Sequence, residues 1–364
     1  MSESRRFPMP SVLQLLSWVG LAISLLTLAL SSPKLIEEGG GAGVVFGNIA
    51  QYLWTIALLV LAFAWTRTIG ARALIGAALG GFFGVSSLAV LVGKPLVTKL
   101  GPDNLFILTV FAPVTEELLK LMPVALFLLL AMRSRQFRPS VGDVVLFGAT
   151  VAVGFSMYEN ILYARATGGG WLDTLPFSPA LPFLSTYGSM LVGGHVVYTA
   201  LASLGLAITV IYGGRIRLAR WAWLVAFAVV LIEHMTVNRL MNISGDGPDL
   251  LVRIGSIITL RGYLSTLLLL GGVVATGVYE TRLVKRGGAK LPASLTLHDI
   301  VAGFASSSRW AGVQQVTKRL RYESLRRSSV FAAAQTDQNP PDAGAIASVV
   351  RLYRNAGIAS GVTV

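Results

Sequence analysis

The sequence predicts an all-α fold, a polytopic membrane helix bundle of about eight transmembrane helices with a basic cytoplasmic C-terminal tail. Two observations support this prediction. Of the 364 residues, 54% are hydrophobic and only 13% are charged, whereas soluble proteins carry about 25% charged residues. The apolar residues also come in long runs instead of alternating with polar ones, which is typical of membrane-spanning helices.

Eight of these runs reach the length of about 20 residues that a helix needs to cross a bilayer. The third run is rich in glycine, which permits close packing of helices in lipid. The runs cover residues 11–30, 48–66, 71–93, 104–131, 141–163, 184–212, 220–240 and 254–279.

The loops between the runs predict the orientation of the chain. Basic residues concentrate in every second loop, and the remaining loops mix fewer basic residues with acidic ones. Because strongly basic loops stay in the cytoplasm, this unbroken alternation indicates an even number of spans with both termini cytoplasmic. The same bias explains the net charge of +13, so nucleic acid is not an expected partner.

The composition changes near residue 281, which predicts a transmembrane domain at 1–280 and a basic cytoplasmic tail at 281–364. We expect the tail to be partly disordered or to form short helices. Its block "KRLRYESLRR", Lys318 to Arg327, is suited to contact anionic lipid. The chain has no cysteine, which excludes disulfides, thiolate metal sites and cysteine nucleophiles.

The fourth run carries charges where a membrane helix usually has none. Glu116, Glu117 and Lys120 lie in the stretch "APVTEELLKLMPVALFLLL". Each mid-helix charge costs about 3 kcal/mol on insertion, so these groups need partners inside the bundle. Glu116 and Lys120 are four residues apart and can pair along one face, whereas Glu117 is turned by about 100° toward another neighbour.

Three neighbouring runs carry further polar groups. A depth estimate at 1.5 Å per residue spreads them over about 15 Å, which helix tilt can close. Ionisable groups inside a membrane are rare and indicate a functional site. They are Glu159 and Asn160 in the fifth run, His195 in the sixth, and Glu233, His234 and Asn238 in the seventh.

These residue types fit the hydrolysis of a peptide bond. Glu159, His195 and His234 form a two-histidine, one-carboxylate set that suits a divalent metal, most simply zinc. Glu116 or Glu117 would then act as general base. We expect Asn238 to donate a hydrogen bond to the oxyanion and Lys120 to hold one glutamate ionised. Motifs of the zincin (HExxH) and serine hydrolase (GxSxG) classes are absent.

At this point the motifs resemble those of a known family. "EELLK" resembles the EExxK motif of the PrsW-type intramembrane proteases, and "FSMYEN" resembles their FxxxE motif. His195 and His234 resemble the histidines of their two later motifs. The four motifs occur in the family's order, each in its own run, within residues 104–240. The chain is more distantly similar to the CAAX prenyl endopeptidase superfamily, whose second motif ends in histidine where this chain has Glu159.

The resemblance implies an intramembrane protease of a prokaryotic cell membrane that cleaves membrane-anchored proteins, possible substrates being an anti-sigma factor or a similar regulator. It leaves both a metal-dependent and a metal-free, glutamate-based mechanism open. Two other functions fit parts of the sequence. A proton-coupled transporter also uses buried Glu and His residues, and a catalytically silent scaffold would bind membrane partners through its helices.

Overall fold

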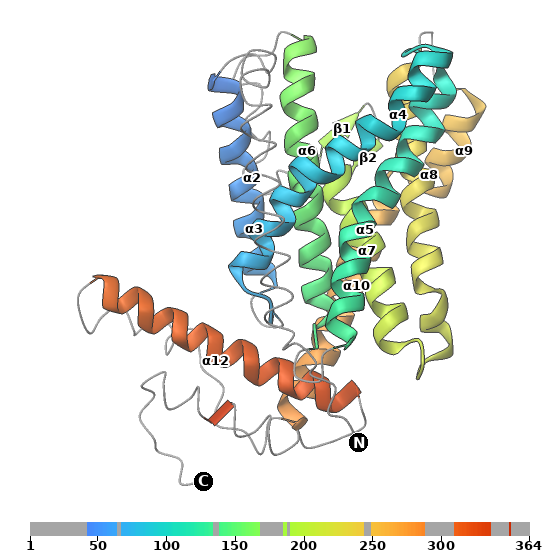
Figure 1. Ribbon diagram of the computed structural model, residues 1–364. Coiled ribbons are helices and arrows are strands. Elements are labelled where there is room, and N and C mark those ends of the chain that lie inside the picture. The colour runs from blue at the N-terminus through green and yellow to red at the C-terminus, as the bar shows by residue number, and fades with distance from the viewer. Residues whose placement is uncertain are drawn as a thin grey trace, which may run out of the picture. The chain divides into compact units, whose positions relative to one another are not determined.

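The computed structural model describes residues 42–63, 67–133, 138–167, 185–187, 190–243, 249–287, 309–335 and 349–350. Within these residues the chain is almost entirely helical, as the apolar runs predict, and it forms an all-α membrane helix bundle (Figure 1). Its first helix, α2, spans Ala42–Ala62. The run at 11–30, predicted as the first span, lies outside the described residues.

One long, oblique helix follows α2. It consists of α3 (Ala71–Leu79), a π-helical turn η1 (Gly80–Val85) and α4 (Ser86–Leu100), and it crosses in front of α6 (Figure 1). A second π-helical turn, η2 (Ile107–Phe111), leads into α5 (Ala112–Arg133). Single π-turns inside helices are frequent at functional sites.

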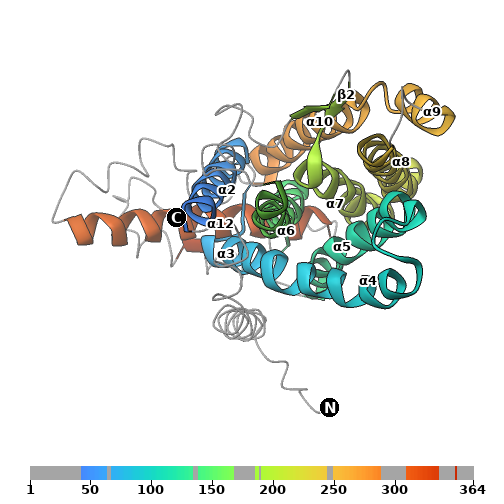
Figure 2. The same cartoon turned by 90° about the horizontal axis from the view of Figure 1, so that it is seen from above.

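The central helix is α6 (Val141–Thr167). Seen from above, α2 and α3 lie on one side of it and α5 and α7 on the other (Figure 2). The close contact of α6 with α3 and η1 requires glycine on both sides. A Cβ at Gly81 of η1 would lie 1.9 Å from the Val151 carbonyl oxygen, and a Cβ at Gly154 of α6 would lie 1.9 Å from the Ala78 carbonyl oxygen. These contacts fix α6, and with it the FxxxE segment, against η1.

The prediction of one helix over 184–212 is wrong at its start. Residues Ser185–Tyr187 (β1) and Met190–Val192 (β2) form an antiparallel hairpin in which Thr186 pairs with Leu191. The helix α7 then spans Gly194–Tyr212. The stretch is not a continuous apolar run, because the dipeptide Gly188-Ser189 separates its two halves in the pattern typical of a hairpin. The hairpin packs Met190 and Val192 against α8.

The remaining helices complete the bundle. A 3₁₀ turn, η4 (Arg217–Trp221), precedes α8 (Ala222–Asn242). The predicted span at 254–279 lies within one candidate span, Leu250–Lys285, but α9 (Leu250–Ile258) and α10 (Tyr263–Gly287) are separated there by a tight turn. Leu260, Arg261 and Gly262 in this turn have positive φ values of 52°, 55° and 83°.

The turn between α9 and α10 contacts strand β2 of the hairpin. The Leu191 N–H donates to the Arg261 carbonyl oxygen at 2.9 Å. A Cβ at Gly262 would lie 1.8 Å from the Leu191 carbonyl oxygen, so only glycine allows this approach. The strained turn therefore fixes β2, which leads directly to His195.

Five of the described helical stretches are long and apolar enough to cross a membrane. The apolar part of α2 is shorter, and α5 carries three charged residues near its middle. The five stretches are Ala71–Leu100, Val141–Ile161, Gly194–Tyr212, Arg217–Asn242 and Leu250–Lys285.

The chain divides into two compact units. The first comprises Met1–Ala62, Arg72–Phe127 and Val144–Val273, and the second comprises Phe63–Ala71, Leu128–Asp143 and Val274–Val364. The second unit contains α12 (Arg309–Gln335), which includes the basic block predicted to contact lipid.

Buried acids organise the second unit by capping helix ends. Asp143 and Ser140 form a capping box at the start of α6. The Asp143 carboxylate also accepts hydrogen bonds from the backbone N–H groups of Thr68 and Ile69, just before α3. Glu280 on α10 accepts from the Val141 N–H at 2.5 Å. These bonds satisfy helix-end N–H groups that would otherwise lack partners.

Candidate active site

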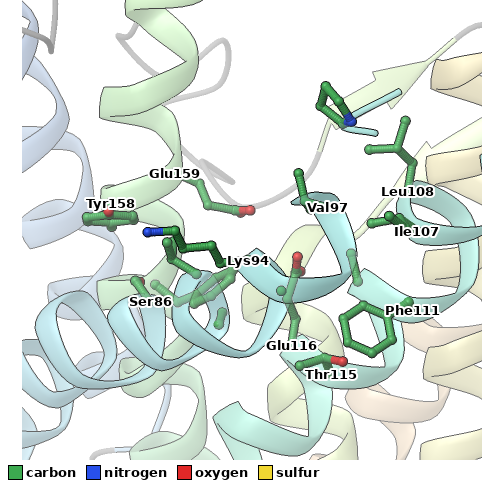
Figure 3. Close-up of a pocket in the computed structure, with 16 residues that line it drawn as sticks. Ser86, Lys94, Val97, Ile107, Leu108, Phe111, Thr115, Glu116, Tyr158 and Glu159 are labelled. Carbon is green, nitrogen blue, oxygen red and sulfur yellow. The ribbon is translucent and has the colours of Figure 1, made fainter. Parts of the chain in front are cut away.

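A groove in the first unit exposes two of the predicted acidic residues. It has a volume of about 480 Å³ and is lined mainly by apolar side chains of α4, η2 and α6. Glu116 of α5 and Glu159 of α6 both line it (Figure 3). The groove is therefore the route by which a substrate would reach these carboxylates.

The two adjacent glutamates of α5 have different surroundings. Glu117 and Lys120 are fully buried, and the Lys120 Nζ lies 2.6 Å from the Glu117 Oε1. Glu116 keeps 15% of its side chain exposed, toward the groove. The expected pairing of Lys120 with Glu116 is thus replaced by an i,i+3 pair with Glu117, which leaves Glu116 to face the groove.

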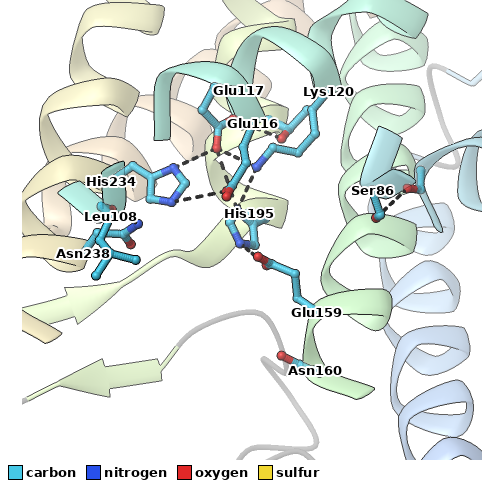
Figure 4. A network of polar contacts seen from close by, with 12 residues as sticks. Ser86, Leu108, Glu116, Glu117, Lys120, Glu159, Asn160, His195, His234 and Asn238 are labelled. Atoms are coloured by element: carbon cyan, nitrogen blue, oxygen red, sulfur yellow. Dashed lines mark hydrogen bonds and ion pairs between the residues drawn. The ribbon is translucent and has the colours of Figure 1, made fainter. Parts of the chain in front are cut away.

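Three further elements bring side chains to the α5 glutamates. Figure 4 shows them converging from α6, α7 and α8. The cluster joins all three charged residues of the EExxK motif to the glutamate of FxxxE and to both intramembrane histidines, and its members are Glu116, Glu117, Lys120, Glu159, His195 and His234.

Glu117 is the most highly connected member. Its Oε1 also lies 3.0 Å from the His234 Nδ1, and its Oε2 accepts a hydrogen bond from the Thr199 hydroxyl at 3.4 Å. A carboxylate has no proton to give, so the His234 Nδ1 carries the hydrogen in this contact. The Nε2 of His234 is then left with its lone pair.

The His234 Nε2 lies 3.8 Å from the Glu116 Oε2. Both atoms are acceptors, and among the described residues no donor is hydrogen-bonded to the Glu116 carboxylate. Two converging acceptors at this spacing require a donor or a cation shared between them. Water, with two O–H groups, and a divalent metal both meet this need.

His195 has both ring nitrogens occupied. Its Nε2 lies 2.5 Å from the Glu159 Oε2, and its Nδ1 lies 2.7 Å from the Lys120 Nζ. The Lys120 ammonium also lies 4.6 Å from the ring centre of Phe155, a cation–π contact. His195 thus connects Glu159 to the Lys120–Glu117 pair.

Asn238 lies beside the cluster rather than within it. Its Nδ2 donates to the Leu108 carbonyl oxygen at 3.0 Å, which ties α8 to the π-turn η2. An amide nitrogen has two hydrogens, so one N–H remains for another acceptor. Asn160 points elsewhere and donates to the Tyr52 hydroxyl at 2.6 Å.

Sequence reasoning missed two members of the surroundings. Thr199 donates to Glu117, and the Tyr198 ring stacks on His234 with 5.3 Å between centres. Both follow His195 by three or four residues on α7, and this helical spacing was the available signal. Glu233 is buried on another side of α8, where it accepts from the Ser265 hydroxyl at 2.8 Å.

The donor set that fits a metal is Glu116, His195 and His234. One ligand atom from each lies within 4.8 Å of the others. Two histidines and one carboxylate make a known catalytic zinc set, and a carboxylate behind each histidine, Glu117 and Glu159, is the usual second layer. Glu159, the carboxylate ligand expected from the sequence, contacts His195, and Glu116 is the carboxylate that lies within this distance of both histidines.

Comparison with known proteins agrees with this geometry. A family model described as "PrsW family intramembrane metalloprotease" matches residues 55–269, which is more than half of the chain and includes all six members of the cluster. No curated protein and no solved structure matches the chain significantly. The chain therefore belongs to the PrsW family of intramembrane metalloproteases, and it is an integral membrane protease.

Proposed function

We propose that this protease uses Glu116 as the general base that activates water against a peptide bond of a membrane-anchored protein. The observation that carries the proposal is the pair of acceptors, the Glu116 Oε2 and the His234 Nε2, that face each other 3.8 Å apart. Glu116 lines an apolar groove at this point, so its carboxylate is accessible to an apolar peptide segment.

The reaction follows from the acceptor pair. A water molecule donates its two O–H groups to Glu116 and His234, which leaves an oxygen lone pair directed at the substrate carbonyl carbon. As the new C–O bond forms, the water proton passes to the Glu116 carboxylate. Glu116 then protonates the leaving amine as the C–N bond breaks, so the base is restored.

The other members of the cluster keep this pair in place. Glu117 accepts from the His234 Nδ1–H and so fixes the tautomer that presents the Nε2 lone pair. Lys120 balances the charge of Glu117, and Glu159 orients His195. The Asn238 N–H that Leu108 does not use is our candidate for the donor to the oxyanion.

In a metal-dependent mechanism, Glu116, His195 and His234 would hold a divalent metal, with zinc the first choice for this donor set, and Glu116 would then be a ligand rather than the base. Such a metal would polarise the substrate carbonyl and make water easier to deprotonate. Binding a metal requires His195 to free a nitrogen from Lys120 or Glu159, since both are occupied.

The finer points of the biological setting are also proposals. We infer about eight spans from the apolar runs, cytoplasmic termini from the loop charges, and contact of the basic tail with anionic lipid. A prokaryotic cell membrane is inferred from the family resemblance alone. An anti-sigma factor or a similar membrane-anchored regulator is the substrate that the family resemblance suggests.

The proposal is tested with purified protein in proteoliposomes. Single-span model substrates are added, and products are mapped by mass spectrometry. Cleavage within or beside the apolar segment, lost in Glu116→Gln, supports it. Intact substrate with the wild type, or equal cleavage by Glu116→Gln, contradicts it. Coupled proton flux without cleavage would favour a transporter instead.

A further inference from the structure

The groove that leads to Glu116 is lined mainly by apolar side chains, and its charged lining residues are Lys94, Glu116 and Glu159. Its walls include Val90, Gly93 and Val97 of α4 and Phe111 of η2. Its volume of about 480 Å³ lies in the range of specific binding pockets. An occupant must therefore be a short apolar segment.

The oblique helix supplies one wall of the groove. It is held against α6 at Gly81, because a Cβ there would overlap the Val151 carbonyl. Beyond this contact, Ser86, Ala89, Val90 and Gly93 line the groove, and at Gly93 a Cβ would meet nothing within 4 Å.

Lys94 is the one cation among the residues that line this groove. Its side chain lies in the groove together with Tyr158 and Glu159 (Figure 3). Within the described residues no carboxylate lies within ion-pair distance of the Lys94 ammonium. Lys94 is exposed, so its ammonium is free to meet a substrate group, and a charge-assisted hydrogen bond to a carboxylate is stronger than one between neutral groups.

We propose that the groove binds an apolar substrate segment with an acidic residue near the scissile bond, whose carboxylate pairs with Lys94. This inference rests on the proposed proteolytic function, because it assigns the groove to the substrate of Glu116. The partner is a side-chain carboxylate of the substrate, since Lys94 lines the same groove as Glu116.

Snorkelling is the other role open to Lys94. A lysine near the end of a membrane helix can extend its amine to the lipid headgroups. Lys99 lies on the same helix, outside the groove lining, and serves as the matched control. Snorkelling predicts no dependence on substrate charge, whereas a substrate pair predicts a strong one.

The experiment uses a model substrate made in three forms, with Asp, Asn or Lys placed in turn at each position flanking the mapped cleavage site. The wild type, Lys94→Met, Lys94→Glu and Lys99→Glu proteins are compared in the same proteoliposomes. The measured quantity is the ratio of cleavage rates for the Asp and Asn forms.

We expect at least one position where the wild type prefers Asp over Asn by about tenfold. Lys94→Met brings this ratio close to one, Lys94→Glu reverses the preference toward the Lys form, and Lys99→Glu keeps the wild-type ratio. A ratio that survives in Lys94→Met overturns the inference, as does a wild type without any preference. In both cases cleavage continues and the proteolytic function stands. Absence of cleavage by the wild type overturns both.

Discussion

Glu117→Gln and Glu116→Gln should have different consequences, although the residues are adjacent: the first should lower the stability of the protein, and the second should lower its cleavage rate. Glu117 and Lys120 form a fully buried pair at 2.6 Å. Glutamine at position 117 can still accept a hydrogen bond from His234, but it no longer balances the Lys120 charge. Glutamine at position 116 leaves no buried cation unpaired, because the nearest partner of Glu116 is His234 at 3.8 Å.

The size of the Glu117 effect follows from its burial. Removing one partner of a buried pair costs about 3–5 kcal/mol in free energy of unfolding. The Lys120 ammonium keeps its contacts with His195 and the Phe155 ring, so we expect the lower end, about 3 kcal/mol. That corresponds to a fall of roughly 5–10 °C in the unfolding midpoint. Glu116→Gln should change stability by less than about 1 kcal/mol while lowering the cleavage rate about 10²- to 10⁴-fold.

The assay combines thermal unfolding in detergent with cleavage of a membrane-anchored substrate. The double variant Glu117→Gln/Lys120→Met removes both charges and should recover part of the lost stability without recovering activity. Equal destabilisation by the two single glutamine variants would refute the assignment of Glu117 as the buried partner of Lys120. So would a double variant that is less stable than Glu117→Gln.

Three further predictions test other parts of the molecule. His234→Ala should bind zinc at least about 100-fold more weakly than the wild type, since even loss of a ligand's supporting partner costs 10- to 100-fold; metal titration of the purified protein measures this. Gly262→Ala should lower both the unfolding midpoint and the cleavage rate, because its Cβ would meet the Leu191 carbonyl at 1.8 Å. Asp249→Asn should lower the unfolding midpoint at pH 7 but not in acid. The Val252 N–H and the Arg239 guanidinium hold the pKa of Asp249 below its usual 3.8, so its stabilisation is present above that pH and is lost as the pH falls through the depressed pKa.

Each of these predictions has a control. Zinc binding by His234→Ala equal to that of the wild type would contradict the donor set, and His298→Ala, outside the family match, is the control. Gly271→Ala on α10, where a Cβ meets nothing within 4 Å, should behave as the wild type. A midpoint difference for Asp249→Asn that stays constant as the pH falls from 7 until the Asp249 carboxylate is protonated would contradict the charge argument.

The sequence could predict which residues form the cluster. Charged groups in a membrane helix need partners, and Glu159, His195, Glu233 and His234 were the ionisable groups in neighbouring runs that could supply them. Helical spacing did not show that Glu233 would lie apart from the cluster, against Ser265. The depth estimate left the groups up to about 15 Å apart. Part of this gap came from the predicted start of the sixth span, because α7 begins only at Gly194 and so carries His195 in its first turn.

The division of roles between Glu116 and Glu117 could not be predicted from helical spacing. Residues three and four positions before Lys120 both lie on its face of the helix, so helical spacing allows a pair with either Glu117 or Glu116. The choice depends on which side of α5 is covered by α7 and α8, and Thr199 and His234 come from those helices. This is tertiary information that no local pattern contains.

The hairpin and the break after α9 were missed for different reasons. The hairpin had a local signal, the dipeptide Gly188-Ser189 between Ser185–Tyr187 and Met190–Val192, and the interpretation of 184–212 as one span passed over it. Leu260 and Arg261 adopt positive φ values, which cost roughly 1–3 kcal/mol each and persist only when neighbours enforce them. The enforcing contact is the backbone of Leu191, about 70 residues earlier in the chain.

The most direct test of the central claim, that Glu116 activates water, is proteolysis in ¹⁸O-labelled water. The wild-type protein and Glu116→Gln are compared in proteoliposomes by the rate at which labelled product appears. We predict that the wild type releases a fragment with one ¹⁸O atom in its new C-terminal carboxylate, and that folded Glu116→Gln forms it at least about 100-fold more slowly. Equal rates for the two proteins would contradict the claim.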